Sequence, residues 1–139
     1  MLSYNIHHIS INVIDIAKSI SFYEVLGFKE CYRFISDDES VSIIHLESNG
    51  FIIELFYYDD TADLDERKEC LFLSKRLGVN HFSFYIRNIN DAYSHLFNEG
   101  VKILCPITSG RTGISYFFIS DPDDNIIEIV QDDRFIIKK

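Results

Sequence analysis

Two histidines and two glutamates stand in the same order in the two halves of this chain. They are His8, Glu54, His81 and Glu128. Imidazole nitrogen and carboxylate oxygen together suit borderline divalent ions, so we expect all four side chains to bind one ion. Zn and Ni are the first candidates, with Mn, Co and Fe as alternatives. Four protein ligands would leave octahedral positions open, which is typical of a catalytic rather than a structural metal site.

The positions of these four residues follow an internal repeat. The pairs that lie 73 positions apart are His8 and His81, Ser10 and Ser83, Asp15 and Asn88, Ser21 and Ser94, Gly27 and Gly100, and Lys29 and Lys102. After one inserted residue, Ile52–Leu55 matches Ile126–Ile129 at a separation of 74, which pairs Glu54 with Glu128. A duplicated module explains this register better than chance does.

Each copy begins with the pattern of a half-buried strand followed by a helix. Apolar residues alternate with polar ones from Ile9 to Val13. Asp15 can cap the first helix and Asn90 the second, and Gly27 and Gly100 suit the left-handed position after each helix. The apolar residues at helical spacing are Ile16, Ile20, Tyr23 and Leu26 in the first copy, and Ala92, Tyr93, Leu96 and Phe97 in the second.

Three strand-like runs follow each helix, separated by turn residues. We place these strands at Phe28–Ile35, Val41–Leu46 and Phe51–Tyr57, and at Val101–Leu104, Ile114–Ile119 and Ile126–Val130. The prediction is therefore an α+β fold of two tandem βαβββ modules, whose curved mixed sheets surround a metal pocket. We expect one domain over 1–139, with module 1 at about 4–58, a linker at about 59–77 and module 2 at about 78–132.

Composition and charge exclude several classes of protein. A net charge of −9 disfavours contact with a phosphate backbone, and 47% apolar residues suffice for a core without disulfides. Cys31, Cys70 and Cys105 lack the spacing of a disulfide scaffold or zinc knuckle and fit small core residues of a reducing compartment. No run resembles a signal peptide or a membrane span, so we expect a cytoplasmic protein that binds neither nucleic acid nor membrane.

The remaining histidines break the repeat, and the glutamates sit in apolar runs. We interpret His7, His45 and His95 as structural or surface residues, with His7 as the main rival of His8 for the ligand role. A single histidine or glutamate is more often an ordinary core or edge residue than a ligand. Glu54 and Glu128, however, each lie within an apolar run, and a buried carboxylate is costly unless it is paired or metal-bound.

The opening segment His7–Phe28 and the segment Asp121–Glu128 resemble the vicinal oxygen chelate superfamily. That superfamily includes glyoxalase I, bleomycin-resistance proteins, extradiol dioxygenases and methylmalonyl-CoA epimerase. The resemblance implies paired βαβββ modules around a metal, with ligands in the order His, Glu, His, Glu, as in glyoxalase I. The acid at Glu54 favours the glyoxalase I-like or epimerase-like branch over the dioxygenases. The resemblance also implies a homodimer, in which each site forms within one chain or across two chains.

The chain departs from the family pattern at three places. Asp124 stands where the closing turn usually has glycine, with Asn125 as the neighbour that could take up the left-handed strain. Asn12 stands where glutathione-dependent relatives carry arginine, and Tyr58 where asparagine is typical. The last two changes weaken the case for glutathione as co-substrate.

The resemblance implies a metal-dependent lyase or isomerase like lactoylglutathione lyase, which moves a proton next to a metal-chelated carbonyl. The substrate would be a 2-oxoaldehyde–thiol adduct and the product a 2-hydroxyacyl thioester. Glu128, and Glu54 as second candidate, would transfer the proton. Arg111, Tyr116 and Phe118 are candidates for substrate contact. The alternatives are an acyl-CoA epimerase of the methylmalonyl-CoA type, a small-molecule binding or resistance protein, and an Fe(II) extradiol dioxygenase.

Overall fold

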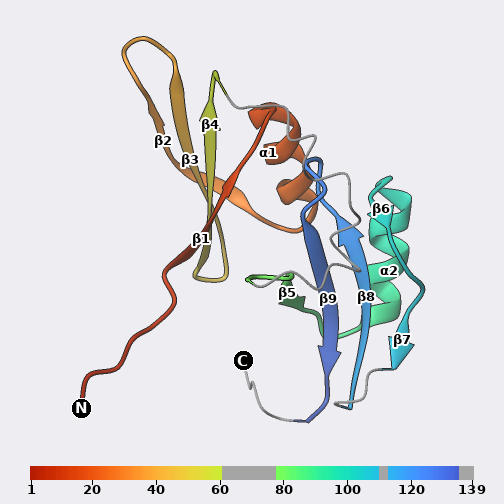
Figure 1. Ribbon diagram of the computed structural model, residues 1–139. Coiled ribbons are helices and arrows are strands. Elements are labelled where there is room, and N and C mark those ends of the chain that lie inside the picture. Colours follow the sequence, from red (N-terminus) through yellow and green to blue (C-terminus); the bar gives the residue numbers. More distant parts are fainter. Residues whose placement is uncertain (61–77, 110–112, 135–139) are drawn as a thin grey trace. The chain divides into compact units, whose positions relative to one another are not determined.

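Each repeat folds into one mixed sheet with one long helix, as Figure 1 shows. The computed structural model describes residues 1–60, 78–109 and 113–134. The chain divides into two compact units, Met1–Asp63 and Leu64–Lys139. Within the described residues, no helix has the length and apolar character needed to span a bilayer.

The first unit has a four-stranded sheet in the order β1-β4-β3-β2. Strand β1 runs parallel to β4, and the other neighbours are antiparallel. The elements are β1 (His8–Asn12), α1 (Ile16–Val25), β2 (Lys29–Ile35), β3 (Val41–Ser48) and β4 (Phe51–Tyr58).

The second unit repeats this topology, with the strand order β5-β9-β8-β6 and a short extra strand, β7, paired with β8. Strands β5 and β9 are parallel, whereas β8 is antiparallel to β9 and β6. The elements are β5 (Phe82–Tyr85), α2 (Ile89–Asn98), β6 (Lys102–Ile103), β7 (Thr108–Ser109), β8 (Ile114–Ser120) and β9 (Ile126–Asp132). The predicted α+β fold of two βαβββ modules is thereby confirmed.

Capping residues define the start and end of both helices. Asp15 accepts a hydrogen bond from the backbone N–H of Lys18 at 3.0 Å, as predicted. In the second unit the cap is Asn88, not Asn90, because the helix begins at Ile89 and Asn90 already lies inside its first turn. The glycines that follow both helices have positive φ, as predicted, at Gly27 (+94°) and Gly100 (+76°).

The pleat of β4 and β9 separates the core face of each sheet from the face that carries the glutamate. In β4, Ile53 and Leu55 are fully buried, and in β9 Ile127 and Ile129 are buried. Aromatic contacts place the helix on that core face. Tyr23 of α1 packs against Phe28, which packs against Phe51, and Tyr93 of α2 packs against Phe117. The intervening Glu54 and Glu128 therefore point to the opposite face of their sheets.

Two turns close the central hairpins. Asn49 and Gly50 have φ of +51° and +81° and form the two-residue turn between β3 and β4. Counted between equivalent paired residues, the connection from β8 to β9 is one residue longer than the connection from β3 to β4. This extra residue is the insertion in the second copy of the repeat. There the left-handed residue is Asp124 itself (φ +62°), so Asn125 does not take up the strain.

Phe97, at helical spacing with the other apolar residues of α2, is 67% exposed, whereas Ile89 and Leu96 are buried. The expectation that the cysteines are small core residues is wrong for Cys31. Cys31 is exposed, because it lies on β2, an edge strand whose residues are all exposed. The other cysteines differ in position: Cys105 is half-buried, and Cys70 lies outside the described residues.

Candidate metal centre

The first histidine–glutamate pair lies across the parallel strands β1 and β4. Nε2 of His8 is 3.6 Å from Oε1 of Glu54. The register sets Ser10 directly opposite Glu54, and His8, two residues earlier, shares the face of Ser10. The side chain of Glu54 is 16% exposed and that of His8 36% exposed, so the pair lies at an accessible surface of the sheet.

The second pair repeats this arrangement next to β5 and β9. Nε2 of His81 is 3.4 Å from Oε2 of Glu128. Ser83 lies directly opposite Glu128, as Ser10 lies opposite Glu54. The structure thus pairs each predicted histidine with the predicted glutamate of its own repeat.

A serine hydroxyl holds each glutamate. Ser83 Oγ donates a hydrogen bond to Oε2 of Glu128, and Ser10 donates one to Glu54. In the sequence, Ser10 and Ser83 stand out only as a matched pair of the repeat, with no predicted role at the site. Their position two residues after each histidine on the same strand face is the signal that could have identified them.

The residue before each histidine contacts the ring nitrogen that faces away from the glutamate. Oδ1 of Asn80 lies 2.6 Å from Nδ1 of His81, and because an amide oxygen only accepts, Nδ1 carries the proton. In the neutral imidazole the lone pair is then on Nε2, the atom that faces Glu128. At the equivalent position, Nδ1 of His7 lies 2.8 Å from Nδ1 of His8. The described contacts of His7 are with His8 and not with Glu54, the partner of the predicted ligand His8.

His45 belongs to the site, and its interpretation as a structural or surface residue is wrong. It lies on β3 directly opposite Glu54, and its Nε2 is 2.7 Å from Oε2 of Glu54. An ionised carboxylate only accepts hydrogen bonds, so the Nε2–H of His45 is the donor. The imidazoles of His8 and His45 lie 6.2 Å apart at an angle of 25°.

The pKa of Glu54 reflects opposing effects. Burial alone raises it, but hydrogen bonds from His45 and Ser10 and the positive potential of His8 and His45 outweigh burial. The net pKa of the Glu54 carboxyl lies below its ordinary value, so this side chain is ionised near neutral pH. An ionised carboxylate is the form that a cation binds.

Within each unit, the spacing of the histidine–glutamate pair fits two ligand atoms of one divalent ion. Ligand bonds of about 2.1 Å place neighbouring ligand atoms about 3.0 Å apart in an octahedron and about 3.4 Å apart in a tetrahedron. The observed separations of 3.6 Å and 3.4 Å are close to the tetrahedral value. Across residues 1–60, 78–109 and 113–134, no group of three or more His, Cys, Asp and Glu side chains is spaced to hold a metal ion. Each unit thus has two potential ligand atoms at suitable spacing, whereas a typical site has four.

The candidates for substrate contact fall in different places. Phe118 lies on β8 opposite Glu128, and its ring meets the edge of His81 with centroids 5.1 Å apart. Tyr116, half-buried on the same strand face, packs against Phe118 at 5.5 Å. Arg111 lies outside the described residues. Phe118 and Tyr116 therefore form an aromatic wall beside the second histidine–glutamate pair.

Comparison with known proteins identifies the family of the chain. Residues 5–129 match the Glyoxalase/Bleomycin resistance protein/Dioxygenase superfamily. The uncharacterized protein YwkD of Bacillus subtilis is 29% identical over 133 residues, which cover 94% of this chain and 99% of YwkD. Lactoylglutathione lyase of Schizosaccharomyces pombe is 28% identical over 150 residues, which cover 94% of this chain and 48% of the lyase. The glyoxalase family protein from Enterococcus faecalis shares the fold, with a TM-score of 0.76 and 24% identity over 91% of this chain and 96% of that one.

Proposed function

Because the chain belongs to the Glyoxalase/Bleomycin resistance protein/Dioxygenase superfamily, we propose that it is a metal-dependent enzyme of the glyoxalase I type. The observation that carries this proposal is the histidine–glutamate pair, which recurs at equivalent places in both repeats. We infer that both pairs bind one divalent ion, with His8, Glu54, His81 and Glu128 as ligands. Zn and Ni remain the first candidates for a set of two nitrogen and two oxygen donors, with Mn, Co and Fe as alternatives.

The proposed reaction is the movement of a proton between two neighbouring carbons of the substrate. A bound divalent ion would act as Lewis acid toward two adjacent substrate oxygens. Glu128 takes the proton from the carbon that carries the hydroxyl and returns it to the former carbonyl carbon. The hydroxyl proton passes to the oxygen of the former carbonyl, so one C–H and one O–H bond break and one of each forms, and the isomerisation needs no oxidant. Ser83 holds Oε2 of Glu128, which leaves Oε1 as the oxygen for the proton.

The substrate class we propose is the adduct of a thiol with a 2-oxoaldehyde, and the product is a 2-hydroxyacyl thioester. Support comes from the similarity to lactoylglutathione lyase of Schizosaccharomyces pombe. Asn12 and Tyr58 stand at the ends of β1 and β4 in place of the residues typical of glutathione-dependent relatives. The assay should therefore compare several thiols, with glutathione as only one of them.

The first experiment determines whether the protein binds a metal and whether Glu128 then transfers a proton. Protein purified without a metal-affinity tag is analysed for metal content and assayed for thioester formation from methylglyoxal adducts. We expect about one divalent ion per pair of repeats, thioester formation, and a loss of about 100-fold or more in Glu128→Gln. Full activity in a metal-free His8→Ala protein would refute the scheme. Turnover of methylmalonyl-CoA in place of the adducts would instead favour the epimerase.

We propose further that the protein is a homodimer, and a mixing experiment tests whether its sites use both chains. His8→Ala inactivates the first repeat and His81→Ala the second. If each site combines repeats of different chains, a heterodimer of the two variants holds one intact site of two. About half of the dimers in an equal mixture are heterodimers, so the mixture regains about a quarter of wild-type activity. If each site lies within one chain, the mixture stays inactive. A protein that sediments as a monomer would contradict the proposed dimer.

A further inference from the structure

The two candidate glutamates differ in the residue that faces them across the central hairpin. The register of β3 and β4 sets His45 opposite Glu54, and the register of β8 and β9 sets Phe118 opposite Glu128. His45 and Phe118 lie 73 positions apart, the separation of His8 and His81, so they occupy the same position of the repeat. One repeat thus has a hydrogen-bond donor where the other has an apolar ring.

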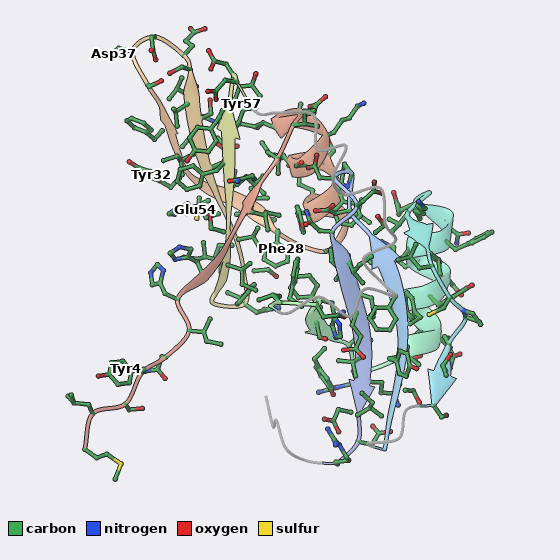
Figure 2. All side chains as sticks on the ribbon, in the orientation of Figure 1. Tyr4, Phe28, Tyr32, Asp37, Glu54 and Tyr57 are labelled. Atoms are coloured by element: carbon green, nitrogen blue, oxygen red, sulfur yellow. The ribbon has the colours of Figure 1, made fainter. Side chains whose placement is uncertain are left out.

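The contacts of His45 direct its ring nitrogen at Glu54. Its Nε2 is 2.7 Å from Oε2 of Glu54, and the side chain is only 22% exposed. The ring of Tyr32, on the neighbouring strand β2, lies 5.5 Å from the imidazole, and the ring of His8 lies 6.2 Å away. Figure 2 labels Tyr32 and Glu54 on this sheet. The imidazole is therefore flanked by two rings and has few alternative orientations.

We propose that His45 is a positioning residue of the metal centre, which holds Oε2 of Glu54 so that Oε1 is the oxygen offered to the ion. This inference rests on the proposed function. Oε1 is the oxygen that faces Nε2 of His8, whereas Oε2 faces His45. A carboxylate with both oxygens available can bind an ion through one or both, but one fixed by a donor on Oε2 is restricted to the first mode. Its orientation is then set before the ion arrives.

Glu54 and Glu128 also differ in the hydrogen-bond donors that hold their carboxylates. Glu54 receives hydrogen bonds from His45 and Ser10, whereas Glu128 receives one from Ser83 and faces the phenyl ring of Phe118. A phenyl ring offers no N–H or O–H donor. Glu54 is thus held from both its own sheet neighbours, His45 and Ser10, whereas Glu128 is held by Ser83 and lacks a donor at the position equivalent to His45.

Matched substitutions test this role through metal binding rather than turnover. His45→Phe gives the first repeat the residue that the second repeat has, and His45→Gln keeps an N–H donor near the place of Nε2. His95→Phe, at an exposed position on α2, is the control for loss of a histidine. Affinity for Zn²⁺ is measured by competition with a chromophoric chelator, and the absorption spectrum of the Co²⁺-loaded protein reports the ligand set. Circular dichroism of the metal-free variants checks folding.

We expect His45→Phe to lower Zn²⁺ affinity about 10- to 100-fold, as loss of a hydrogen-bond partner to a ligand commonly does. His45→Gln should regain most of that loss, and His95→Phe should match wild type. The proposal is overturned if His45→Phe binds Zn²⁺ as wild type does, or if folded His45→Gln is as weak as His45→Phe. It is overturned as well if His45→Phe alters the Co²⁺ spectrum as His8→Ala does, because His45 would then be a ligand. A wild-type protein that binds no divalent ion would overturn the proposed function itself.

Discussion

Removing the side chain of Asn80 should weaken metal binding by changing the proton position on a neighbouring ligand. Oδ1 of Asn80 accepts the Nδ1–H of His81 at 2.6 Å, which keeps the lone pair of the imidazole on Nε2. Loss of such a partner typically costs 10–100-fold in metal affinity. Asn80 is exposed, and water can replace part of its hydrogen bond. We therefore expect Asn80→Ala to lower Zn²⁺ affinity about 10-fold, which corresponds to about 1.4 kcal/mol.

Two variants sharpen the measurement. Asn80→Asp keeps the acceptor and adds a negative charge, which strengthens the hydrogen bond to Nδ1–H, so Zn²⁺ affinity should equal or exceed that of wild type. Asn90→Ala removes an exposed amide from α2, away from the ligands, and should leave the affinity unchanged. Chelator competition at fixed pH and salt gives all three affinities. If Asn80→Ala and Asn90→Ala bind Zn²⁺ equally well, the hydrogen bond does not set the state of His81 and the reasoning is refuted.

Three further predictions concern the scaffold. The buried carboxylate of Asp121 accepts hydrogen bonds from two backbone N–H groups and one side-chain amide in the turn after β8. Asp121→Ala should therefore lower the free energy of unfolding by about 3 kcal/mol in urea titrations. Asp37→Ala, at an exposed position, is the control. Hydrogen bonds from Ser40 and Ser36 lower the pKa of Asp38 from 3.8 to about 2. The contribution of ionised Asp38 to stability is therefore complete above pH 3.8 and is lost as the pH falls toward 2. Ser40→Ala should raise the pKa of Asp38 measured in carboxyl NMR titrations. An unchanged titration midpoint of Asp38 would contradict this. Phe117 is fully buried and packs against Tyr93. Phe117→Ala should therefore lower the free energy of unfolding by about 3–5 kcal/mol, measured by thermal or urea unfolding. A decrease of under about 1 kcal/mol would contradict the place of Phe117 in the core.

The sequence predicted the elements well because their signals are local. Alternation gave the strands, and the need for a positive φ after each helix gave Gly27 and Gly100. The cap of the second helix was misplaced, although Asn88 is the repeat counterpart of Asp15 and the repeat pointed to it.

The histidine–glutamate pairs were predictable within each repeat, but the roles of Ser10, Ser83 and His45 were missed. Two parallel strands whose histidine and glutamate share a face bring these side chains together, and both predicted pairs are present. His45 was missed because its role depends on the register of the hairpin rather than on spacing along the chain. The two-residue turn at Asn49 and Gly50 fixes that register, and counting back from it sets His45 opposite Glu54. The binding of one ion by all four residues stays a prediction.

The alternation of inward and outward side chains along β4 and β9 has a consequence for how such a protein can evolve. Ile53 and Leu55 anchor the helix on one side of the backbone, and Glu54 between them points to the other side. Residues on that outward face can thus be substituted one at a time without disturbing the packing that keeps the chain folded. A single scaffold can in this way be adapted to a new ion or reaction by substitutions at a few outward positions. The same freedom is open to a protein engineer who wishes to install a different set of donors.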